Sequence, residues 1–275
     1  MSGHLEAVAP GVLAWLADSP SPGHPNAGVI VDEDGLTLVD TLLVPAQWEP
    51  LAEAVEALDR PLRRVVLTSS HIEYVGGTAR FWQAGFYGTT QASTHLDQPA
   101  NVDIYRRMFP DLADEFDPEL RTHPVTHVVR EPAWITPAIR ALPLSGQTAE
   151  NLIVHVPGAA VVFAGALASF GVTPDAFQGD PTTWAESLAT IDSLAPTVVP
   201  GHGPVGGRAD IDMQIAYLLA CADAAGSGDD LPAGPWDDWP GRHLDPSNIE
   251  RAAMLARGDD GIPESVIDRL GLQQP

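Results

Sequence analysis

Short apolar runs alternate with amphipathic segments along most of this chain. Runs of four to seven largely apolar residues predict strands at positions 11–17, 27–31, 36–40, 64–68, 125–130, 139–144, 152–156, 160–164 and 197–200. Apolar residues at helical spacing predict helices at positions 45–58, 77–84, 101–109, 182–194, 211–225, 246–257 and 263–270. Asp34-Gly35 has the chemistry of a tight turn, so the second and third strands are expected to form a hairpin.

The order of these segments indicates an α/β architecture. Strands followed by a helix occur over residues 11–59 and again over residues 125–194, which is typical of two βα halves packed into a sandwich. Residues 225–234 are rich in Gly and Asp and contain a Pro, as expected for a connector. We therefore predict one domain over residues 1–225, and a linker with a helical extension over residues 226–275 that packs on the core.

Residues 68–77 read Thr-Ser-Ser-His-Ile-Glu-Tyr-Val-Gly-Gly. This segment resembles the Thr-His-x-His-x-Asp-His-x-Gly-Gly signature of the metallo-β-lactamase superfamily. Four further landmarks of that family occur in the expected order, each at the end of a predicted strand. They are Asp40-Thr41, Gly146-Gln147-Thr148, Phe163-Ala164-Gly165-Ala166-Leu167 and Pro200-Gly201-His202-Gly203. The resemblance covers about residues 10–225. It implies a four-layer αβ/βα sandwich with the site along one edge of the paired sheets.

The resemblance also locates the family's metal-ligand positions, and most of them have changed. They are occupied here by Ser69, His71, Glu73, Tyr74, Gln147, Ala166 and His202. The first metal position would keep only His71, and the second only Glu73 and His202, while Ala166 removes the bridging carboxylate. A catalytic zinc usually has three protein ligands, so no metal cofactor is expected. The alternative is a single Zn or Fe held by His71, Glu73 and His202.

Without a metal, the same positions predict acid/base chemistry. The candidate catalytic residues are Ser69, His71, Glu73, Tyr74, Gln147 and His202. An imidazole beside a carboxylate can transfer protons near neutral pH, and Tyr74 and Gln147 can donate hydrogen bonds to a developing oxyanion. Cyclases and dehydrases of aromatic polyketide assembly in this family suggest a cyclase, dehydratase or isomerase of biosynthesis. Two alternatives stay open: a mononuclear-metal hydrolase of esters, lactones or thioesters, and a non-catalytic ligand-binding protein.

Aromatic residues in irregular segments predict the substrate class. Tyr105, Phe109, Phe170 and Trp236 are the candidate substrate-binding residues. Aromatic side chains in loops above a pocket favour an apolar or aromatic small molecule.

The composition of the chain limits the classes of partner that it is expected to bind. The formal net charge is −23 and the chain contains no lysine, which argues against nucleic acids and anionic membrane surfaces as partners. The start of the chain lacks the basic region and apolar run of a signal peptide, so a cytoplasmic protein is expected. The single Cys221 lies in an apolar helical pattern and is expected to be a buried thiol. A homodimer is left open, as is the role of residues 235–275 as a lid or a dimer arm.

Overall fold

Two β-sheets form the centre of the protein. The computed structural model describes residues 3–272. The first sheet has seven strands in chain order, β1 to β7, and the second has five in the order β12-β11-β10-β9-β8. The strands of the first sheet are β1 (Gly3–Ala9), β2 (Val12–Ala17), β3 (Ala27–Asp32), β4 (Gly35–Val39), β5 (Leu62–Val66), β6 (Gly85–Gly88) and β7 (His127–Val128). Those of the second are β8 (Ala133–Trp134), β9 (Arg140–Leu144), β10 (Asn151–Val156), β11 (Val161–Ser169) and β12 (Thr197–His202).

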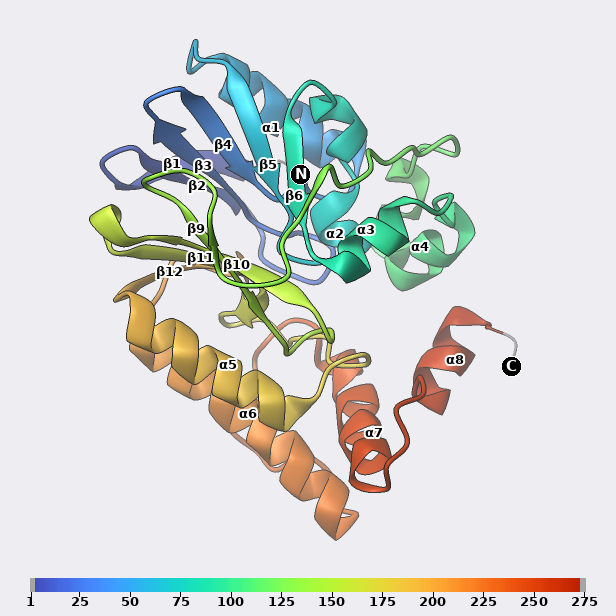
Figure 1. Ribbon diagram of the computed structural model, residues 1–275. Helices are drawn as coiled ribbons and strands as arrows, with labels where there is room; N and C mark the ends of the chain where they lie inside the picture. The colour runs from blue at the N-terminus through green and yellow to red at the C-terminus, as the bar shows by residue number, and fades with distance from the viewer. Residues whose placement is uncertain (1–2, 273–275) are drawn as a thin grey trace.

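Helices cover the outer face of each sheet (Figure 1). On the first sheet these are α1 (Pro45–Glu56), α2 (Ile72–Val75) and α3 (Thr90–Leu96), with the 3-10 turn η1 (Thr78–Phe81). On the second sheet α5 (Pro181–Leu194) and α6 (Arg208–Ser227) lie side by side, in yellow and orange. This arrangement confirms the four-layer αβ/βα sandwich that the sequence predicted.

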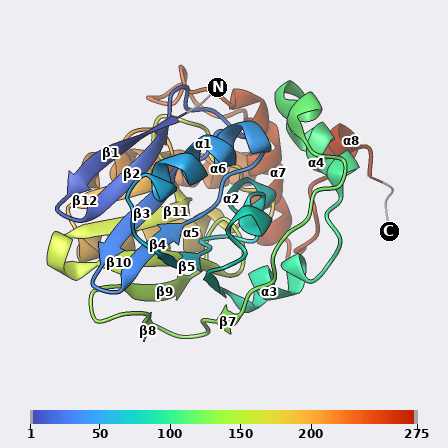
Figure 2. The same ribbon diagram turned by 90° about the horizontal axis from the view of Figure 1, so that it is seen from above.

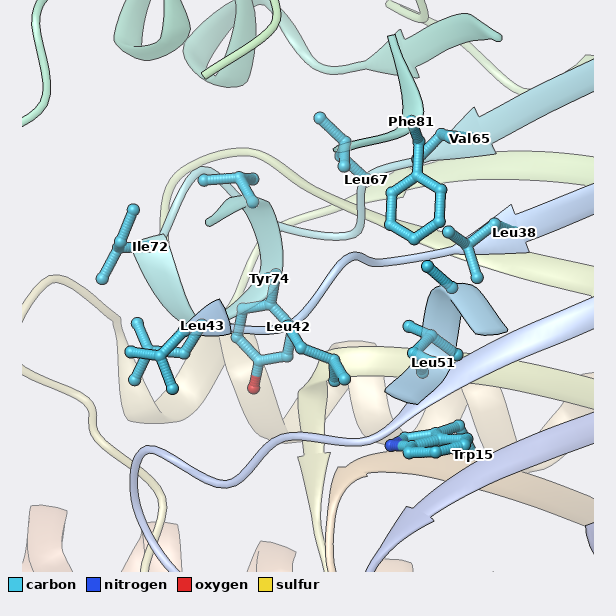
Figure 3. Close-up of a cluster of buried hydrophobic side chains, with 14 of the residues drawn as sticks. Trp15, Leu38, Leu42, Leu43, Leu51, Val65, Leu67, Ile72, Tyr74 and Phe81 are labelled. Carbon is cyan, nitrogen blue, oxygen red and sulfur yellow. The ribbon is translucent and has the colours of Figure 1, made fainter. Parts of the chain in front are cut away.

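Three hydrophobic clusters hold the layers together, one between the sheets and one under each helical layer. Figure 3 shows the cluster of the first helical layer, in which Leu51 of α1 and Phe81 of η1 lie near Leu38 and Val65 of the sheet. Between the sheets the packing is so close that a β-carbon added at Gly28 would lie 2.1 Å from the ring of Phe163. A glycine on β3 therefore lets the second sheet approach the first.

Several predicted elements differ from the observed ones. The strand β1 was not predicted, because its residues are mostly half-buried or exposed and lack an apolar run. The predicted strand at 125–130 is reduced to β7, two residues long. The helix predicted at 77–84 is the short 3-10 turn η1, whereas β11 continues five residues past its predicted end at 164, to Ser169.

The C-terminal region packs along one end of the sandwich. It comprises the turn η4 (Arg242–Leu244), α7 (Asp245–Ala256), which packs on α6, and α8 (Glu264–Leu270). In both views α8 lies on the side of α4 (Val102–Met108) (Figure 1, Figure 2), and α4 in turn contacts the turn η2 (Pro110–Glu115). The remaining turn, η3 (Pro157–Ala159), connects β10 to β11. Within residues 3–272 every helix is too short or too polar to cross a membrane.

Candidate active site

A pocket lies at the edge of the sandwich where β11 and β12 end. Its floor is formed by Glu73 and Tyr74 of α2, Ala166 of β11 and His202, the last residue of β12. Met108 and Phe109 at the end of α4 cover it, together with residues of the C-terminal region: His243, Leu244 and Arg269. The cavity has a volume of about 40 Å³, which is room for a few water molecules.

Glu73 and His202 form the charged centre of this pocket. Glu73 Oε1 lies 3.5 Å from His202 Nε2 and accepts a hydrogen bond of 2.7 Å from the backbone N–H of Gly23. Burial opposes ionisation of Glu73, but the hydrogen bond and charge of His202, together with the Gly23 N–H, outweigh it and leave the pKa of Glu73 below its ordinary value. At neutral pH the pocket therefore contains the Glu73 carboxylate beside the ring of His202.

Asn26 fixes the turn that carries His202. Its amide Nδ2 donates to the carbonyl of Pro200 at 3.0 Å and to that of Gly203 at 2.8 Å, while its Oδ1 accepts from the backbone N–H of Ala17. All polar atoms of the Asn26 amide are thus used, so the turn is held from both sides of His202. Within residues 3–272 the Nδ1 atom of His202 is buried without a hydrogen-bond partner.

Tyr74 provides a phenol next to the pair. Its ring is buried among the side chains of the first helical layer, beside Leu42 (Figure 3), and meets the His202 ring edge-on at 6.1 Å. A β-carbon at Gly201 would lie 2.7 Å from the Tyr74 hydroxyl oxygen, so only glycine fits there. Burial raises the pKa of Tyr74 well above its ordinary value. Tyr74 is therefore a hydrogen-bond donor at physiological pH.

A second set of polar residues forms a directional chain of hydrogen bonds beside the pocket. Ser69 Oγ donates to Gln147 Oε1 at 2.8 Å, Gln147 Nε2 lies 2.8 Å from His71 Nδ1, and His71 Nε2 lies 2.9 Å from Gln178 Oε1. The His71 ring also stacks on Phe177 at a centroid distance of 5.6 Å. His71 is thus held on three sides.

The neighbouring amides determine the direction of this chain. Asn151 Oδ1 accepts from the backbone N–H of Thr148, so Asn151 Nδ2 must be the group that donates to Gln147 Oε1. Gln147 then presents its NH₂ group to Nδ1 of His71, which must accept. The proton of a neutral His71 is therefore on Nε2, where Gln178 Oε1 accepts it.

The structure brings all six sequence-predicted catalytic residues to this region. Glu73, Tyr74, Gln147 and His202 line the pocket, and Ser69 and His71 adjoin it through Gln147. Of the predicted substrate-binding residues only Phe109 lines the pocket. The other three are core residues: Tyr105 packs in the first helical layer, and Phe170 and Trp236 pack under α5 and α6.

Other residues of the site carry no recognisable sequence signal. Gly23 and Asn26 come from the loop before β3, and Asp175 and Gln178 from the loop between β11 and α5. Burial raises the pKa of Asp175, while the charge of Arg269 opposes that effect. These residues lie in loops, and only the folded chain brings them to the pocket.

The sequence profile of the metallo-β-lactamase superfamily matches residues 20–270. The chain belongs to the metallo-β-lactamase superfamily. This confirms the family that the motifs at residues 68–77 and 200–203 indicated, and the match continues past the predicted limit near 225 into the C-terminal region.

Solved structures of metallo-β-lactamases share the fold. The mono-zinc form of FIM-1 from Pseudomonas aeruginosa is 20% identical, with a TM-score of 0.62 over 80% of this chain and 96% of that chain. A metallo-β-lactamase from Erythrobacter litoralis is 20% identical, with a TM-score of 0.60 over 78% of this chain and 95% of that one. One from Hirschia baltica is also 20% identical, with a TM-score of 0.61 over 79% and 98% of the two chains.

The residues of this superfamily member do not fit the two-metal centre that the family implies. Both ring nitrogens of His71 are used by Gln147 and Gln178, so no lone pair of His71 is left for a metal ion. Among the family's ligand positions, Glu73 and His202 then remain as ligands of the usual types, with the phenol of Tyr74 beside them. Within residues 3–272 no three or more His, Cys, Asp or Glu side chains form a group able to hold a metal ion.

Proposed function

We propose that this metallo-β-lactamase-fold protein is a small-molecule enzyme that works by acid/base chemistry, as a cyclase, dehydratase or isomerase. The observation that carries the proposal is the pair of Glu73 and His202 on the floor of a covered pocket, 3.5 Å apart. A carboxylate that stays ionised can balance the charge of an imidazolium formed when the imidazole takes a proton.

Each residue then has a distinct task. His202 accepts a proton from a carbon next to a substrate carbonyl, and the Glu73 carboxylate stabilises the imidazolium. Tyr74, whose pKa is raised by burial, donates a hydrogen bond to the carbonyl oxygen as it becomes an enolate. The proton later returns from His202 to the substrate, at another atom in an isomerisation or at the leaving hydroxyl in a dehydration. Gln147 lines the pocket beside this pair, and its hydrogen bond to His71 fixes its orientation.

The walls of the pocket favour a substrate with an apolar or aromatic body. Phe109, Met108 and Leu244 cover it, and Trp184 closes it from the side of α5. The cavity of about 40 Å³ is smaller than a typical ligand pocket of about 300–1,000 Å³. We infer that α4 and α8 move outward to admit the substrate and close over it, which would exclude water from the pair.

Proton exchange tests this proposal without knowledge of the natural substrate. Chelator-treated protein is incubated in D₂O with a panel of aryl ketones, and loss of the protons next to the carbonyl is followed by NMR. His202→Ala should slow exchange by about 10²–10⁴-fold, the usual contribution of a general base, and Tyr74→Phe should also slow it. His127→Ala, at an exposed imidazole stacked on Tyr87, is the matched control and should exchange as the wild type does. Exchange unaffected by His202→Ala would refute the proposed role of the pair.

A metal-dependent hydrolase of esters, lactones or thioesters is the second candidate. Two ligands of one tetrahedral ion, each at about 2.0–2.2 Å, lie roughly 3.3–3.5 Å apart, and Glu73 Oε1 and His202 Nε2 have that separation. The third ligand would be Tyr74, whose raised pKa opposes the phenolate form. Elemental analysis separates the candidates, because about one zinc or iron per purified chain would favour the hydrolase. A folded protein that turns over neither class of substrate would be a ligand-binding protein.

A further inference from the structure

Arg269 is the one permanent cation among the residues that line the pocket, in the part of the chain that the structure describes. It belongs to α8, which is held over the pocket at both ends. Arg107 of α4 donates to the carbonyl of Leu270 at 2.7 Å, and Glu250 of α7 accepts from the backbone N–H groups of Glu264 and Ser265 at 2.8 and 3.1 Å. These contacts fix the helix, and Arg269, which is exposed to solvent and lines the pocket, lies at its mouth.

The guanidinium of Arg269 is left without a close partner. Between residues 3 and 272 no side-chain hydrogen bond or ion pair involves it, although its charge acts on Asp175 across the mouth. Glu73, the other carboxylate of the pocket, is already bound by Gly23 and His202. Arg269 therefore retains a planar set of donors that suits a carboxylate, which guanidinium groups bind through two parallel hydrogen bonds.

We propose that Arg269 binds a carboxylate of the substrate, so that the pocket selects small molecules with an apolar body and a carboxylate. This rests on the proposed function, since it assigns the substrate class of the same pocket. The apolar body would lie against Phe109, Met108 and Trp184, and the carboxylate at the mouth. The reacting carbon would then lie on the floor, next to His202. Asp175 also lines the pocket and interacts with the charge of Arg269.

The helix that carries Arg269 contributes no residue to the three large hydrophobic clusters. Apart from its polar anchors, α8 is held by a small apolar cluster in which Val266 and Leu270 pack on Phe177. Phe177 in turn stacks on His71. A bound carboxylate would add a further contact to α8 in the closed position, which couples substrate recognition to closure of the pocket.

Two probe molecules of nearly the same shape test the proposal: 3-phenylpropionate, which has a carboxylate, and 3-phenylpropionamide, which is neutral. Their dissociation constants are measured by calorimetry with the wild type, Arg269→Gln and Arg257→Gln. Arg257 is an exposed arginine of the same region that does not line the pocket. We expect the wild type and Arg257→Gln to prefer the carboxylate by about tenfold or more, as expected for a charge-assisted bond, and Arg269→Gln to lose the preference.

Three results would overturn this assignment: equal affinity of the wild type for the two probes, no binding of either probe, or a preference that survives Arg269→Gln. The same titration with His202→Ala keeps the two proposals apart. A carboxylate preference that depends on Arg269 and persists in His202→Ala supports the binding site even if His202 has no effect on proton exchange. In that case the acid/base proposal alone would fail.

Discussion

Asp40 allows a sharp test of the electrostatics around the site. It is 1% exposed, and its two carboxylate oxygens accept from the backbone N–H and the hydroxyl of Thr68, each at 2.7 Å. Burial raises the pKa of Asp40 from 3.8 to about 7, although the hydrogen bonds from Thr68 oppose that effect. At about 1.4 kcal/mol per pH unit, this difference corresponds to roughly 4 kcal/mol of stability.

The direction in which stability changes with pH follows from the protons bound by the folded and the unfolded protein. The folded protein holds a proton on Asp40 between pH 3.8 and about 7, whereas the unfolded chain has released it. Stability contributed by this group is therefore complete below the unfolded pKa and is lost as the pH rises through about 7. Asp40→Asn is close in shape and cannot ionise, so it should remove this loss. It disturbs the bond to the Thr68 hydroxyl, which costs about 1 kcal/mol at every pH.

The assay is urea unfolding of the wild type and Asp40→Asn between pH 4 and pH 8. We expect the difference in unfolding free energy to grow in favour of the variant by up to about 1.4 kcal/mol per pH unit, and to level off above pH 7. Asp97→Asn, at an exposed carboxylate, controls for the loss of one negative charge and should follow the wild type. Parallel curves of unfolding free energy against pH for the wild type and Asp40→Asn would show that ionisation of Asp40 does not destabilise the folded protein.

Three further predictions follow from particular contacts. The pKa of Glu73 is lowered in the folded state, so its contribution to stability is present above the unfolded pKa of 4.5 and is lost as the pH falls through the folded value. Glu73→Gln should therefore flatten the acid side of the curve of unfolding free energy against pH. An acid side that is unchanged when unfolding is followed by circular dichroism would contradict this. Burial raises the pKa of the Cys221 thiol to about 12, so labelling by a thiol reagent at pH 8 should be at least about a thousandfold slower in the native than in the denatured protein; rapid native labelling would show that Cys221 is accessible. Gly28→Ala places a β-carbon 2.1 Å from the Phe163 ring and should destabilise the protein by about 1–3 kcal/mol in thermal unfolding, whereas Gly226→Ala, with nothing within 4 Å, should not.

The fold could be predicted from sequence because its landmarks are local. The segment at 68–77 begins just after β5, and residues 200–203 span the end of β12. These two segments carry the site residues Glu73 and Tyr74, in α2, and His202, at the end of β12. Elements at the sheet edges were less predictable: β1 pairs on one side only, with β2, and its residues are too exposed to give an apolar pattern.

The residues that contact the predicted site residues could not be identified from local sequence patterns. Gln178 and Asp175 lie in a loop without a motif, and their place depends on contacts distant in the chain. Asn248 of α7 holds this loop, since its Oδ1 accepts from the N–H of Ala176 at 2.9 Å and its Nδ2 donates to the carbonyl of Pro174 at 2.8 Å. Sequence patterns report burial and local geometry, not which distant amide will meet a given imidazole.

These long-range contacts make the C-terminal region part of the site. Asn248 is fully buried, and a buried amide without partners would be costly, so α7 and the loop at 174–178 must form together. That loop supplies Phe177 and Gln178, which hold His71, and α8 places Arg269 at the mouth. The imidazole that would face the first metal in the family is thus bound by glutamines, one of them in a loop that α7 supports. Restoring a single ligand at position 147 would leave Gln178 on Nε2 and Ser69 without its acceptor, so recovery of a metal centre requires changes in the core and in the loop together.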